Sequence, residues 1–108
     1  MPIPKVALSQ IELERDESLH LTRLLLSRTY TPAIATYIKE VIDKVAASPT
    51  IELGGMALAV LNVTLNSIIA DRSTEQADVL RLTGILYKVQ RQVAERMKEI
   101  LAQAPLTH

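Results

Sequence analysis

A stretch of 18 residues without a charged side chain, from Leu53 to Ala70, is the feature that most constrains the fold of this chain. A run of this length is barely long enough to form a transmembrane helix. Its glycines and its hydroxyl and amide side chains, together with the well-charged segments on either side, favour a helix that protein covers on most sides. We therefore expect no membrane partner.

Capping signals predict where the helices before this stretch begin. Ser9 and Glu12 have the spacing of a capping box, which predicts a first helix from Ser9 to about residue 28. Thr31 followed by Pro32 predicts the start of a second helix, since proline is favoured at the first helical position. This second helix should end near Ala47.

The third and fourth helices are separated by a short polar segment. The third begins either at Pro49 or just after Gly55, two alternatives that the residues leave open, and it ends near Ala70. Ser73 and Gln76 form another possible capping box, and no helix breaker follows until the proline near the C-terminus. The fourth helix should then measure about 45 Å against about 24 Å for the second. It should therefore extend beyond the bundle that the other helices form.

Apolar residues recur at heptad spacing along the fourth helix and continue into this extension. Val93, Met97, Ile100 and Leu101 belong to the continuing stripe. Because a monomer rarely exposes such a stripe, we expect a second copy of the chain, or another protein, to cover it.

A second stripe, of small and amide side chains, lies along the uncharged helix: Gly55, Ala59, Asn62, Asn66 and Ala70. Small residues allow a neighbouring backbone to approach closely, and a symmetric pair of asparagines can fix the register of a dimer. The stripe therefore marks either a homodimer axis or the least buried side of the helix, facing water. A ligand site lined by the two amides is a third interpretation.

The catalytic and metal-ligating candidates are few. Glu17 and His20 match the Glu-x-x-His element of di-iron helical bundles, which need two such elements and two further carboxylates. The segment from Arg15 to His20 resembles the Arg-x4-His signature of HEPN nucleases, which are small all-helical dimers. This resemblance implies RNA cleavage, although Arg15 and His20 point about 140° apart on a regular helix.

Composition excludes several other functions. Twelve basic and twelve acidic residues give a net charge of zero, so the chain is not a general nucleic-acid binder. The absence of cysteine excludes disulfides and zinc-thiolate sites, and it is typical of a reducing cytoplasm. We find no phosphate-binding loop or nucleophile elbow, and residues 1–8 lack the apolar run of a signal peptide. We therefore expect no cofactor and no metal.

Together these patterns predict a single all-α domain over residues 1–108, with residues 1–8 as an extended arm and residues 104–108 as a frayed tail. Its architecture should be a four-helix antiparallel bundle with a long C-terminal helix, assembled as a homodimer. We expect a non-catalytic, cytoplasmic protein–protein interaction or scaffolding module. The alternatives are a metal-binding or RNA-cleaving protein that uses Glu17 or Arg15 with His20, and a regulator that binds a small ligand. The predicted dimer interface comprises Gly55, Ala59, Asn62, Asn66, Val93, Met97, Ile100 and Leu101.

Overall fold

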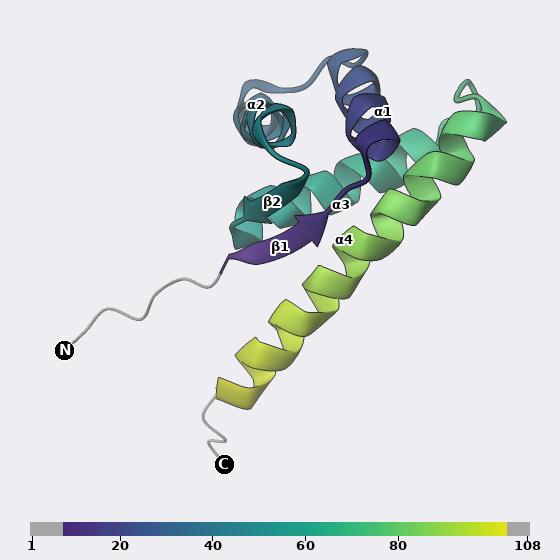
Figure 1. Cartoon of the computed structure of the whole chain (residues 1–108). Helices are drawn as coiled ribbons and strands as arrows, with labels where there is room; N and C mark the ends of the chain where they lie inside the picture. Colours follow the sequence, from purple (N-terminus) through teal and green to yellow (C-terminus); the bar gives the residue numbers. More distant parts are fainter. Residues whose placement is uncertain (1–7, 104–108) are drawn as a thin grey trace.

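The computed structural model describes residues 8–103, which form four helices and one small sheet (Figure 1). In chain order the elements are β1 (Ser9–Glu12), α1 (Arg15–Leu26), α2 (Pro32–Ala47), β2 (Thr50–Leu53), α3 (Gly55–Ala70) and α4 (Gln76–Gln103). The mostly helical class is confirmed, whereas the sheet was not predicted. The predicted tail, and the predicted arm apart from Leu8, lie outside the described residues. Within residues 8–103, no helix has the length and apolar character needed to span a membrane.

The predicted capping box at Ser9 is wrong, because this segment is a strand. Strand β1 pairs antiparallel with β2, with Ser9 opposite Leu53 and Ile11 opposite Ile51. Ser9 and Ile11 are buried while the residues that follow each of them are exposed, which is the alternation of a half-buried strand. Pairing with a distant segment and burial of Ile11 therefore outweigh the local preference for a helix start.

Helix α1 begins instead after Glu14, whose backbone N–H donates to Glu17 Oε1 at 2.8 Å. The same carboxylate oxygen accepts a hydrogen bond from Lys88 Nζ of α4 at 2.6 Å. Lys88 Nζ also donates to the backbone carbonyl of Glu12 at 2.9 Å. A single lysine thus fastens the junction between β1 and α1 to the middle of α4.

The second and third helices follow their local signals. Helix α2 begins directly after Thr31 and ends at Ala47, as predicted. Helix α3 begins at Gly55, the later of the two predicted starts, because residues 50–53 are taken up by β2.

The turn between α3 and α4 is organised by Asp71 rather than by the predicted capping box at Ser73. The backbone N–H and the hydroxyl of Ser73 donate to Asp71 Oδ1 at 2.9 and 2.8 Å, and α4 begins only at Gln76. Arg28 donates to the other carboxylate oxygen at 2.8 Å. These hydrogen bonds, those from Ser73 first, lower the pKa of Asp71 to about 2 because they favour its charged form.

The helices are not four aligned rods. Helices α3 and α4 form one layer, and α1 and α2 lie across it as a second layer (Figure 1). In Figure 1, α3 and α4 run across the picture in opposite directions, while α2 is seen nearly end-on above the sheet. The predicted antiparallel alignment therefore applies to α3 and α4 but not to α2. Every layer contributes to one aliphatic core, in which fully buried side chains include Leu25, Val41, Ile51, Leu65 and Val89.

Candidate functional site

The stripe of small and amide residues lies on the outer side of α3. Ala59 and Asn66 are exposed, while Gly55 and Asn62 are half-buried. Asn66 Nδ2 donates to the backbone carbonyl of Asn62 at 2.9 Å, so the two amides are close neighbours. Asn62 Oδ1 is buried without a hydrogen-bond partner among residues 8–103. Val63, beside the stripe, is 66% exposed, so the uncharged helix has one side open to solvent.

The C-terminal part of α4 extends past the other elements (Figure 1). Val93 still packs against the core, but Met97, Ile100 and Leu101 are 51%, 57% and 68% exposed. At 100° per residue, Ile100 lies on the same side as the buried Val89, so it continues the core side of α4 beyond the core itself. These apolar side chains have no cover within the described part of the chain.

A second exposed stripe runs along α4, and its first member, Tyr87, lies beside Gln10 and Glu12 of β1. Tyr87, Ala94 and Leu101 are all exposed and are spaced seven residues apart, which keeps them on one side of the helix. The two helices are antiparallel neighbours, with the start of α3 at Gly55 facing Arg96 near the end of α4. The two predicted interface segments therefore lie on neighbouring helices, and of the residues predicted on α4 only Leu101 belongs to this stripe.

We call the exposed residues of these two helices the hairpin face. We define it by Ala59, Val63 and Asn66 of α3 with Tyr87, Ala94 and Leu101 of α4. Helix α3 contributes no charge to it. At 100° per residue the charged residues of α4 fall within an arc of about 160° that begins beside this stripe, with Lys98 about 20° from Tyr87. The hairpin face therefore includes several large, exposed apolar side chains and no charged residue, and the exposed residues Arg91 and Lys98 lie at its border.

The metal-ligating candidates of α1 have other partners. Glu17 is bound by Lys88, as described above, and His20 Nε2 lies 3.3 Å from Asp78 Oδ1 of α4. Arg23 donates to the same oxygen of Asp78 at 2.8 Å. Among residues 8–103 no group of three or more His, Cys, Asp or Glu side chains is arranged to hold a metal ion. The contacts of Glu17 and His20 join α1 to α4.

Arg15 and His20 are not brought together by the structure. Arg15 lines a groove between α1 and α2, whereas His20 contacts Asp78 on α4. The two side chains therefore lie on different sides of α1, as the angle between them on a helix predicts.

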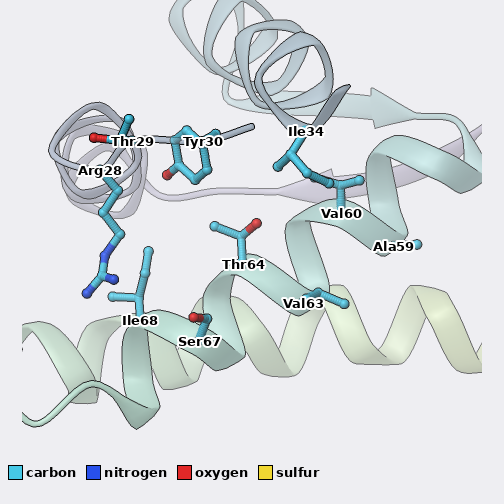
Figure 2. Close-up of a pocket in the computed structure, with 10 residues that line it drawn as sticks. All are labelled: Arg28, Thr29, Tyr30, Ile34, Ala59, Val60, Val63, Thr64, Ser67 and Ile68. Carbon is cyan, nitrogen blue, oxygen red and sulfur yellow. The ribbon is translucent and has the colours of Figure 1, made fainter. Parts of the chain in front are cut away.

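A cleft against α3 was not predicted from the sequence. It lies between α3 and the segment that joins α1 to α2, and its lining includes Tyr30, Ile34 and Thr64 (Figure 2). Neither Asn62 nor Asn66 lines it, so the predicted amide-lined ligand site does not correspond to this cleft. Thr64 is the one residue that could have indicated the cleft from the sequence. A hydroxyl on the buried side of an otherwise apolar helix needs an explanation.

Comparison of the chain with protein-family models, with curated proteins and with solved structures found no match.

Proposed function

We propose that the protein is a non-catalytic homodimeric module, which joins a second copy of itself through the hairpin face and serves protein–protein interaction or scaffolding. The observation that carries this proposal is that α3 and α4, the neighbouring helices on which the sequence predicts the interface, both expose large apolar side chains. Tyr87 and Leu101 are each 68% exposed there, and Val63 is 66% exposed. Contiguous apolar surface of this kind is typical of an interaction site.

A second copy fits the hairpin face better than a charged partner does. The residues that define the hairpin face carry no charge, so they meet their own copy without like-charge repulsion and offer no ion pair to an acidic or basic partner, while Arg91 and Lys98 lie at the border of the face. The small side chains of Ala59 and Ala94 allow the helices of two copies to approach closely. The spacing of Tyr87, Ala94 and Leu101 suits a helix packing along a helix.

The size of the hairpin face is also sufficient for a dimer. Helix α3 is about 24 Å long at 1.5 Å per residue, and two neighbouring helices present a width of about 20 Å. With the extension of α4 added, each copy offers about 600 Å², or about 1,200 Å² in total, at the lower end of the range for stable complexes. We therefore propose a dimer of micromolar affinity. The compartment that we propose is the cytoplasm, which suits a chain without cysteine.

The test compares one substitution at two positions of α4. Ala94→Glu places a carboxylate of each copy in the proposed interface, where burial of a charge is costly. Ala77→Glu is the matched control, because Ala77 is exposed on the charged side of the same helix. We expect sedimentation equilibrium to show a wild-type dimer at about 1–100 μM and association at least about tenfold weaker for Ala94→Glu alone.

Two results would contradict the proposal. One is a wild-type protein that stays monomeric up to about 100 μM. The other is an equal effect of Ala94→Glu and Ala77→Glu on association, because the hairpin face would then have no special role.

A further inference from the structure

The chain contains the same arrangement of elements twice. Residues 9–47 form a strand and two helices, and residues 50–103 form the same three elements in the same order. The two strands pair antiparallel with Ile11 opposite Ile51, and each of these isoleucines is followed by Glu and Leu. Because equivalent residues face each other across an antiparallel pair, a local two-fold axis relates the two strands.

The buried side chains follow the same plan in both halves. In the first helix of each half, three residues with the same spacing are buried: Leu21, Leu24 and Leu25 of α1, and Leu61, Thr64 and Leu65 of α3. The second helices also match: Ile38, Val41 and Val45 of α2, and Leu82, Ile85 and Val89 of α4. The two halves are therefore equivalent in their packing as well as in their order of elements.

Two lysines extend this equivalence to the hydrogen bonds. Lys44 of α2 donates to the backbone carbonyl of Glu52 in β2. Lys88, at the equivalent position of α4, donates to the backbone carbonyl of Glu12 in β1. Each lysine thus binds the strand of the other half, as a two-fold relation between the halves requires.

This equivalence relates the α3 part of the hairpin face to a groove between α1 and α2. Counted from the first buried leucine of each helix, the hairpin-face residues of α3 correspond to three residues of α1: Leu19, Arg23 and Leu26. All three line the groove, which has a volume of about 790 Å³. Its other wall is formed by the end of α2 and the residues after it, 45–49. The first half therefore has a counterpart of the surface through which we propose that the second half binds a helix.

The groove differs from the hairpin face in its charge. Leu19 and Leu26 are 65% and 66% exposed, and their spacing of seven residues places them on one side of α1. The two charged residues of the lining are both arginines. Arg23 is bound to Asp78, whereas Arg15 makes no ion pair with any of residues 8–103. The groove is therefore an apolar surface bordered by positive charge.

We propose that this groove binds an amphipathic helix of another protein, which carries large aliphatic side chains on one side and acidic side chains beside them. The aliphatic side chains pack on Leu19 and Leu26, and a carboxylate pairs with Arg15. Helix α1 has 12 residues and is about 18 Å long, so a partner helix of about three turns lies along it. A second copy of the groove fits less well, because it would bring the arginines of both copies together. This inference rests on the proposed role in protein–protein interaction and names the chemistry of the partner.

The probe is a fluorescein-labelled helical peptide of about 14 residues, with leucines at helical spacing and alanine and glutamate elsewhere. A second peptide has lysine in place of glutamate. Fluorescence anisotropy with the full chain should give a Kd of about 10–100 μM for the acidic peptide and at least about fivefold weaker binding of the basic peptide. The chain has no net charge, so overall attraction does not account for such a difference.

Two substitutions locate the peptide. Leu26→Glu should weaken binding of the acidic peptide at least about tenfold, because it places a carboxylate in the apolar part of the groove. Leu80→Glu is the matched control, since Leu80 is 67% exposed on α4 and does not line the groove. Arg15→Glu should weaken the acidic peptide about fivefold and strengthen the basic one. Glutamate is favoured in the first turn of a helix, so this variant should fold.

Equal affinity for the acidic and basic peptides, or an equal effect of Leu26→Glu and Leu80→Glu, would overturn the proposal. Weaker self-association of Leu26→Glu would also overturn it and assign the groove to a second copy. Tighter binding of dodecanoate than of the acidic peptide would overturn it in favour of a lipid. The groove shares no lining residue with the hairpin face, so Ala94→Glu should bind the peptide as the wild type does. A monomeric wild type that binds the acidic peptide would therefore refute the dimer and support the groove proposal.

Discussion

Lys88 offers the sharpest test of how the two crossed layers are joined. Its Nζ lies 2.6 Å from Glu17 Oε1 and 2.9 Å from the backbone carbonyl of Glu12. The side chain of Glu17 is only 15% exposed and that of Lys88 37%. Lys88→Met keeps an unbranched aliphatic stem and removes every donor, so it isolates the contribution of the ammonium group.

The expected loss follows from these contacts. A hydrogen bond to a charged partner contributes about 1.5–3 kcal/mol, and one to a neutral carbonyl about 1 kcal/mol. Solvent at Lys88 places the ion pair at the lower end of its range. Lys88→Met should therefore lower the free energy of unfolding by about 2–3 kcal/mol. In a domain of this size the midpoint of thermal unfolding should fall by about 10–15 °C.

Thermal and urea unfolding followed by circular dichroism measure this loss, at a fixed protein concentration because a dimer would make the midpoint depend on it. Lys98→Met is the matched control, since Lys98 is exposed on the same helix. Glu17→Gln keeps an acceptor for the start of α1 while removing the charge. A double-mutant cycle of Lys88→Met and Glu17→Gln should give a coupling free energy of about 1 kcal/mol or more. If Lys88→Met and Lys98→Met agree within about 0.5 kcal/mol, Lys88 does not fasten the layers.

Three further predictions concern single residues. Asp71 has a lowered pKa of about 2, so its contribution to stability is present above the ordinary value of 3.8 and is lost as the pH falls towards 2; the difference in unfolding midpoint between wild type and Asp71→Asn should shrink over that interval. Burial raises the pKa of Tyr30 above 10, against a smaller opposing effect of the nearby arginine. A spectrophotometric titration should show a late tyrosinate phase that Tyr30→Phe removes, and an unchanged late phase would refute this assignment. Ile11→Ala should cost about 3 kcal/mol of unfolding free energy, because Ile11 is 2% exposed in β1. Gln10→Ala, on the exposed side of the strand, should change stability by less than about 0.5 kcal/mol, and equal losses would mean that β1 does not bury Ile11.

Local signals were sufficient where a helix boundary depends on its own few residues. Thr31 and Pro32 set the start of α2 because proline at the first helical position needs no partner elsewhere in the chain. The end of α3 at Ala70 follows in the same way from the polar segment after it. The capping-box spacing of Ser9 and Glu12 is a signal of equal quality, yet the helix start that it predicts is wrong.

It failed because strand pairing is decided by a segment far along the chain. The tripeptide Ile-Glu-Leu occurs at residues 11–13 and again at 51–53, and its isoleucines are opposite one another in the sheet. Each occurrence of the tripeptide lies in a strand that alternates buried and exposed side chains over a few residues only. Such short alternation predicts a strand only when both occurrences of the tripeptide are considered together, since neither strand is stable without the other.

The hairpin face and the cleft also differ in how much of each the sequence alone could predict. The distribution of charge around α4 and its absence from α3 follow from the order of residues on a helix, and Ala59, Asn66 and Leu101 of the hairpin face belong to the interface that the sequence predicts. That the two helices lie side by side depends on the tertiary packing of α3 against α4. The cleft depends on more, because Tyr30 must reach over Thr64 from another layer.

The sequence by itself determined the helical class, the start of α2 at proline and the sides of α4 that carry charge, since these depend on residues within a few turns of one another. Only the tertiary structure decided that residues 9–12 form a strand, that Glu17 and His20 join α1 to α4, and that Thr64 lines a cleft. The physical reason is that burial and hydrogen bonding between distant segments outweigh local preferences of similar or smaller size.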